Sequence, residues 1–117
     1  LYANWPTNYD RDVITPTVKQ ERRARCIDSL RHVMPVAEDC GVHVDLEILN
    51  RFENYIINPV DEGLEMVDAV GSKNCDLLLD MFHMSIEEND IPAAIRNAAG
   101  RIGKFHVSGR YERCDRC

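Results

Sequence analysis

Apolar side chains recur at helical spacing in the first third of the chain. The run extends from about Val18 to Cys40, and Gly41 ends it, as glycine does at many helix C-termini. Thr17 is of a type that caps helix starts. The pattern predicts a long amphipathic helix, with apolar positions at Ile27, Leu30, Val33, Met34, Val36 and Ala37.

The next segment changes to a period of two. Val42, Val44, Leu46 and Ile48 occupy alternate positions and are mostly β-branched, which predicts a strand over residues 42–49. Its apolar face is expected to pack on helices. The opposite face carries Asp45 and Glu47, as expected if that face points toward the polar end of a barrel interior.

A second helix is predicted after this strand. Asn58 and Pro59 have the residue types of an N-cap and a first turn, and acidic side chains follow them. The helix should run to about Val70 and end at Gly71.

The last third of the chain repeats the alternation of strand and helix. A short apolar strand is predicted over Cys75 to Asp80. Asp90 and Pro92 start another helix that ends near Arg101 and Gly103, and a final strand covers residues 104–108. Residues 1–16 have the pattern of a strand end followed by an irregular loop.

Strands and helices that alternate in this way predict an α/β fold with right-handed parallel crossovers. A complete (β/α)8 barrel needs roughly 250 residues. The 117 residues are therefore predicted to form a fragment of a single TIM barrel domain, with about three to four consecutive βα units from its middle and second half.

Glu47, Asp80 and His106 each lie at the C-terminal end of a predicted strand, at intervals of 33 and 26 residues. A parallel barrel brings such positions to one mouth. Two carboxylates and one imidazole form a hard donor set, which suits Mg²⁺ or Mn²⁺ and also admits Co²⁺. The alternative for each residue alone is a helix cap or an ion pair; three at matching positions favour a metal site.

Charge and cysteine content narrow the class of protein. The 20 acidic and 14 basic side chains give a net charge of -6, which disfavours nucleic acid as a partner. The basic cluster Arg22, Arg23 and Arg25 is expected to be a solvated helix face.

Five scattered cysteines fit a reducing cytoplasm, and no stretch is apolar enough to cross a membrane. Cys114 and Cys117 form a lone C-x-x-C, to which we assign no function.

Two motifs carry a family resemblance. The segments L46-E-I-L-N-R-F-E-N54 and L78-L-D-M-F-H-M-S-I-E-E88 resemble the ketose 3-epimerases, which include D-tagatose and D-psicose 3-epimerases. The resemblance continues into G103-K-F-H106 and implies a xylose-isomerase-like TIM barrel. It implies that Glu47 is both a metal ligand and a catalytic acid/base, and that Asp80 and His106 are further ligands of a divalent metal, most commonly Mn²⁺.

The same resemblance implies a set of substrate-binding residues. Glu53 and His83 match residues that contact the sugar, and Trp5, in L1-Y-A-N-W-P6, is similar to a pocket tryptophan. Arg113 matches a substrate-binding arginine if one residue is inserted before it. The implied reaction moves a proton at C3 of a free ketose through a cis-enediolate. A second glutamate, expected beyond Cys117, returns the proton on the opposite face.

Three alternatives remain open. One is a hydroxypyruvate isomerase or inosose-type isomerase or lyase on the same barrel, and another is a non-catalytic half-barrel. An endonuclease-IV-like phosphodiesterase is a third, which the acidic charge disfavours. If the protein is an epimerase, we expect a small ketose substrate and no nucleic-acid or membrane partner. We also expect a cytoplasmic location and a homo-oligomer (dimer or tetramer). The fragment alone is expected to be inactive.

Overall fold

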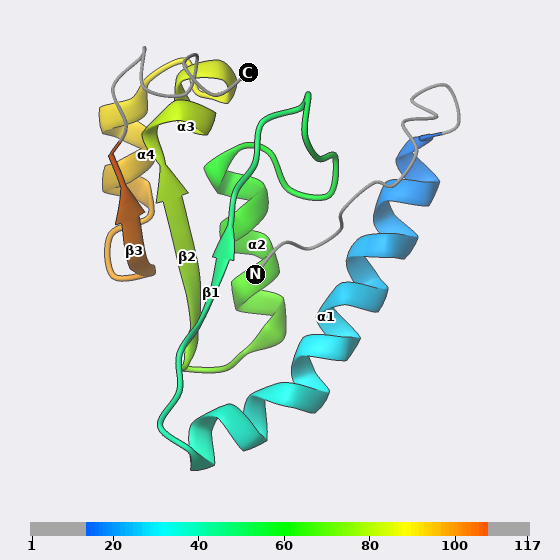
Figure 1. Cartoon of the computed structure of the whole chain (residues 1–117). Helices are drawn as coiled ribbons and strands as arrows, with labels where there is room; N and C mark the ends of the chain where they lie inside the picture. Colours follow the sequence, from blue (N-terminus) through cyan, green and yellow to red (C-terminus); the bar gives the residue numbers. More distant parts are fainter. Residues whose placement is uncertain (1–13, 108–117) are drawn as a thin grey trace, which may run out of the picture.

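The structure, a computed structural model, describes residues 14–107 and shows helices packed beside a small sheet (Figure 1). The three strands of the sheet alternate with the helices along the chain. The helices are α1 (Pro16–Asp39), α2 (Val60–Val70), α3 (Met81–Glu87) and α4 (Ile91–Asn97), and the strands are β1 (Val44–Glu47), β2 (Cys75–Asp80) and β3 (Ile102–His106).

The sheet has the order β1-β2-β3, and both pairs of neighbours are parallel. Val44 pairs with Cys75, and Asp80 pairs with His106. Because sequential strands lie side by side with helices between them, the predicted parallel α/β architecture is confirmed. The described sheet is open at β1 and β3, as expected for part of a barrel.

The start of α1 differs from the prediction. Thr15, not Thr17, is the N-cap: its hydroxyl accepts the Val18 N–H at 3.3 Å, and Pro16 follows in the first turn. Proline is favoured in the first turn because N–H groups there have no acceptor within the helix, so the N–H that proline lacks costs no hydrogen bond. The predicted helix is otherwise present. Of its predicted apolar positions, Leu30, Met34 and Ala37 are buried, whereas Val33 and Val36 are exposed.

Arg22 and Arg25 of the arginine cluster on α1 are exposed, as predicted, but Arg23 is only partly exposed. The Arg23 guanidinium donates to the Glu62 carbonyl at 3.1 Å and to the Glu65 carboxylate at 3.0 Å, both on α2. Arg22 donates to the Tyr55 hydroxyl, and its guanidinium lies over the Tyr55 ring. These two arginines therefore link α1 to the α2 region.

Asn58 does not cap α2, contrary to the prediction. Its buried side chain donates to the carbonyls of Leu49 at 2.7 Å and Asn54 at 2.9 Å, so it is occupied within the loop. The helix begins at Val60, directly after Pro59, and the Val60 N–H donates to the Glu88 carboxylate at 2.7 Å.

The ends of the later elements are partly as predicted. Gly71 ends α2 with a left-handed φ of 76°, and Asp90 caps α4, both as expected. However, α4 ends at Asn97 because Gly100, with φ 86°, turns the chain before Arg101. The short helix α3 was not predicted; it begins directly after Asp80.

Close packing of α2 on the sheet depends on Gly63. A Cβ at this position would lie 2.9 Å from the Ile48 Cδ1 and 3.1 Å from the Leu77 Cδ2. Ile48 directly follows β1 and Leu77 lies in β2, and both side chains are almost fully buried. The absence of a side chain at Gly63 therefore sets how closely α2 approaches β1 and β2.

We expect Gly63→Val to lower the free energy of unfolding by about 1–3 kcal/mol, because its methyl groups would overfill this contact. Urea denaturation measures the change. Glu65→Val is the matched control: it places the same β-branched residue on α2 at an exposed site and removes an ion pair worth less than about 1 kcal/mol. Equal losses in both variants would show that the contact is not tight.

Candidate metal centre

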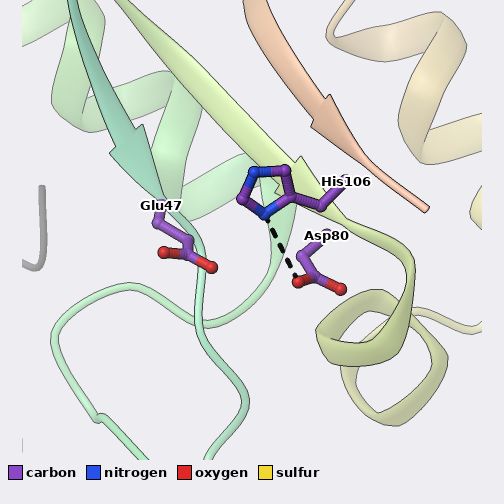
Figure 2. A group of neighbouring side chains, drawn as sticks. All are labelled: Glu47, Asp80 and His106. Atoms are coloured by element: carbon purple, nitrogen blue, oxygen red, sulfur yellow. Dashed lines mark ion pairs between the residues drawn. The ribbon is translucent and has the colours of Figure 1, made fainter. Parts of the chain in front are cut away.

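Glu47, Asp80 and His106 meet at one edge of the sheet. Each is the last residue of its strand, and parallel pairing brings these ends together. One ligand atom from each residue can be chosen so that all three lie within 4.8 Å of one another. Figure 2 shows the three side chains directed into the same space from β1, β2 and β3. The convergence predicted from their spacing is therefore present.

Asp80 uses its two carboxylate oxygens differently. Oδ1 accepts the Phe82 N–H at 2.8 Å and so caps α3. Oδ2 lies 3.7 Å from the His106 Nδ1, on the side of the candidate centre. Since the residue is fully buried, the cap fixes the carboxylate and leaves one oxygen directed at its neighbours.

The electrostatics of the group favour a bound cation. Glu47 is 9% exposed and Asp80 is 0% exposed, so water screens the two carboxylates poorly. Two close negative charges in such surroundings repel each other, and a divalent cation between them offsets that repulsion. The donor set of two carboxylates and an imidazole fits Mn²⁺, Mg²⁺ or Co²⁺.

The two predicted substrate residues in the described region lie beside this centre. His83, on α3, is 1% exposed, and its Nε2 is 3.8 Å from the Glu47 Oε1. Glu53, in the loop between β1 and α2, has an oxygen 3.9 Å from the His83 Nδ1. The structure therefore brings His83 beside Glu47, and Glu53 beside His83.

The sequence prediction gave no role to Asn50, although it lies within the first motif. Its buried side chain donates to Glu53 at 3.0 Å and contacts the His83 Nδ1 at 2.8 Å. The available signal was a polar amide immediately after Ile48 and Leu49, the two apolar residues that follow β1. Asn50 connects the two predicted substrate residues.

Arg51 fastens the loop after β1 to α3. Its guanidinium donates to the Glu87 carboxylate from Nε at 3.0 Å and from Nη2 at 2.8 Å. Desolvation raises the pKa of Glu87, but the hydrogen bonds and the positive charge of Arg51 outweigh it, so the pKa lies below its ordinary value. The ion pair therefore joins the segment that carries Asn50 and Glu53 to the helix that carries His83.

Some sequence predictions fall on other parts of the chain. Trp5 and Arg113 lie outside the described residues, so their substrate-binding roles stay predictions, and Cys114 and Cys117 also lie outside them. Among residues 14–107, no helix has the length and apolar character required to cross a bilayer.

Comparison with known proteins supports the resemblance seen in the two motifs. The family model for xylose isomerase-like TIM barrels matches residues 2–117. The D-psicose 3-epimerase of Ruminiclostridium cellulolyticum is 44% identical over 107 residues, which are 92% of this chain and 35% of that protein. The L-ribulose 3-epimerase of Mesorhizobium japonicum is 43% identical over 88 residues, 75% of this chain and 30% of that protein.

A solved structure of a D-psicose 3-epimerase has a similar fold. The crystal structure of D-psicose 3-epimerase with D-tagatose from Clostridium cellulolyticum H10 matches with a TM-score of 0.80 and 44% identity, over 89% of this chain and 35% of that one. The chain thus spans about a third of the length of these relatives. The predicted ketose 3-epimerase resemblance and the partial barrel fold are confirmed.

We expect Glu87→Gln to destabilise the fold at pH 7 by breaking the Arg51 ion pair. Because folding lowers the pKa of Glu87, its stabilisation is present above the pKa of the unfolded state and is lost as the pH falls through that of the folded state. Urea denaturation from pH 7 down to about pH 3 should therefore show the two proteins converging at acidic pH.

Arg51→Gln and the double variant complete a mutant cycle for this ion pair. The two single losses should not add, since each substitution breaks the same interaction. Additive losses at pH 7, or a Glu87→Gln effect that persists at acidic pH, would contradict the role assigned to the pair.

Proposed function

This chain belongs to the xylose isomerase-like TIM barrel family, and we propose that the protein carrying it is a divalent-metal-dependent ketose 3-epimerase. The observation that carries the proposal is the convergence of Glu47, Asp80 and His106, with His83 and Glu53 beside them. The named relatives act on ketoses, which supports a small sugar as the substrate.

C3 epimerisation is a proton transfer next to a carbonyl group. The C2 carbonyl of a ketose acidifies the C3 proton, and loss of that proton gives a cis-enediolate whose charge rests on neighbouring oxygens. When bound, a divalent cation supplies a Lewis acid that stabilises such charge. Glu47, Asp80 and His106 would hold it, with Mn²⁺ the proposed ion.

Glu47 is the proposed base on one face of the sugar. Its carboxylate is at the rigid end of β1, in surroundings that exclude most water. A base must reach the proton at hydrogen-bond distance, and a fixed strand end provides a constant position for it. Glu53 and His83 would bind the sugar hydroxyls and orient C3 toward Glu47.

Epimerisation also needs an acid on the opposite face, because inversion requires the proton to return from the other side. The described sheet contributes three strands, and the chain covers 35% of the D-psicose 3-epimerase it matches. We therefore propose that activity requires the remaining barrel strands, which would supply the second carboxylate, and that this segment alone is inactive.

Metal binding is tested with Asp80→Asn. Asparagine keeps an oxygen to cap α3 but removes the charge that faces His106, so Mn²⁺ affinity should fall by more than about 10-fold with little loss of helix. Calorimetric titration measures the affinity. Asp90→Asn is the matched control, because it makes the same change at the exposed cap of α4. Equal affinities in all three proteins would contradict the site.

Catalysis is tested with Glu47→Gln in the protein at its natural length, supplied with Mn²⁺. D-Psicose, D-fructose and D-tagatose are the substrates, and their C3 epimers are separated by chromatography. Loss of the base should lower kcat by about 100- to 10,000-fold. Glu65→Gln, on the exposed side of α2, is the control and should retain activity.

Two results would count against this assignment. Unchanged turnover by the Glu47→Gln variant would show that Glu47 is not the catalytic base. Turnover of hydroxypyruvate in preference to all three ketoses would place the protein with the other isomerases of this barrel.

A further inference from the structure

The side chain of Asn50 has one orientation that satisfies its neighbours. Its Oδ1 accepts the backbone N–H of Phe52 at 2.9 Å, and its Nδ2 donates to the Glu53 Oε1 at 3.0 Å. A backbone N–H can only donate, and an ionised carboxylate can only accept. An inverted amide would break both contacts, so the positions of oxygen and nitrogen are determined.

This orientation directs a second amide hydrogen at His83. The Asn50 Nδ2 lies 2.8 Å from the His83 Nδ1, and the Asn50 backbone N–H reaches the same ring nitrogen at 3.3 Å. A ring nitrogen that receives two N–H donors must present its lone pair to them. In this arrangement Nδ1 carries no proton, and the proton of the neutral imidazole is on Nε2.

Contacts with Glu53 and Glu47 agree with that tautomer. The Glu53 Oε1 lies 3.9 Å from Nδ1, which is longer than a hydrogen bond, whereas it accepts from Asn50 at 3.0 Å. On the other side of the ring, Nε2 faces the Glu47 Oε1 at 3.8 Å. The Phe82 ring packs at 66° to the imidazole plane.

We propose that Asn50 is a positioning residue that fixes His83 as its Nε2–H tautomer. His83 then offers a hydrogen-bond donor, not a base, toward Glu47 and toward a sugar oxygen bound beside it. The same amide holds Glu53, so a single buried side chain sets the direction of two substrate contacts. The part that concerns the sugar rests on the proposed function; the tautomer rests on the contacts alone.

The tautomer can be read directly by ¹⁵N NMR of the protein at its natural length, labelled at histidine. The His83 resonances are assigned by their loss in His83→Gln. We expect a bare Nδ1 and a protonated Nε2 at neutral pH. A proton on Nδ1 in the unmodified protein would overturn the proposal, whatever happens to any variant.

Asn50→Asp tests the cause. The substitution preserves shape but replaces the donating NH₂ by an acceptor, so His83 should move its proton to Nδ1. The kcat for a ketose should fall by about 10- to 100-fold, the range seen when a residue that orients a ligand is lost. An unchanged His83 tautomer in this variant would also overturn the proposal.

Asn58→Asp is the matched control in the same loop. Asn58 is also buried and donates to two backbone carbonyls, so the aspartate should destabilise the loop as much as or more than the Asn50 change. It should leave the His83 tautomer as it was. A tautomer shift in this control would show that loop damage alone is sufficient and would refute the specific role of Asn50.

The two proposals fail separately. A protein with Nε2–H on His83 but no epimerase activity would refute the proposed function and support the Asn50 assignment. An active epimerase with Nδ1–H on His83 would do the reverse.

Discussion

The parallel pairing of β1, β2 and β3 is the constraint on which the candidate centre depends. A parallel sheet sends all its strands in one direction, so the last residues of the strands share an edge. The Asp80–His106 register pair brings the imidazole beside the buried carboxylate, and β1 brings Glu47 to the same edge. A shift of one residue in any strand would turn its terminal side chain to the opposite face, among the helices.

The loop after β1 and the short helix α3 form a second layer over this edge. They are joined by polar contacts: Asn50 with His83, Arg51 with Glu87, and the Val60 N–H with Glu88. Such contacts are directional, whereas the apolar packing beneath them is not. The helices and sheet therefore set the position of the edge, and the polar network sets the orientation of the groups on it.

Much of the fold could be predicted from the sequence because it follows from periodicity. The alternation of apolar and polar residues predicted β1. A short apolar run predicted β2 with the same first and last residues as in the structure. The convergence of the three candidate ligands was predictable because the strand ends of a parallel sheet lie at one edge. These features depend on residue type and spacing, which a sequence displays directly.

The misses concern features that residue type and spacing alone do not determine. α3 follows β2 directly, and Asp80, which caps it, was interpreted only as a strand end and metal ligand, so the start of this helix was missed. Asn58 had the residue type of a helix cap, but two backbone carbonyls of the loop bind its amide. The role of Asn50 depends on which way its amide faces, and only the folded arrangement of Phe52, Glu53 and His83 determines that.

The two oxygens of Asp80 restrict which amino acids this position can accept. Capping α3 requires a short side chain with an acceptor, which serine, threonine and asparagine also provide. Holding the proposed cation beside His106 would require a negative charge, which glutamate also provides, but its extra methylene moves the carboxylate away from the capping position. Aspartate alone among the twenty meets both demands. The position therefore has almost no mutational freedom, for reasons that are half structural and half chemical.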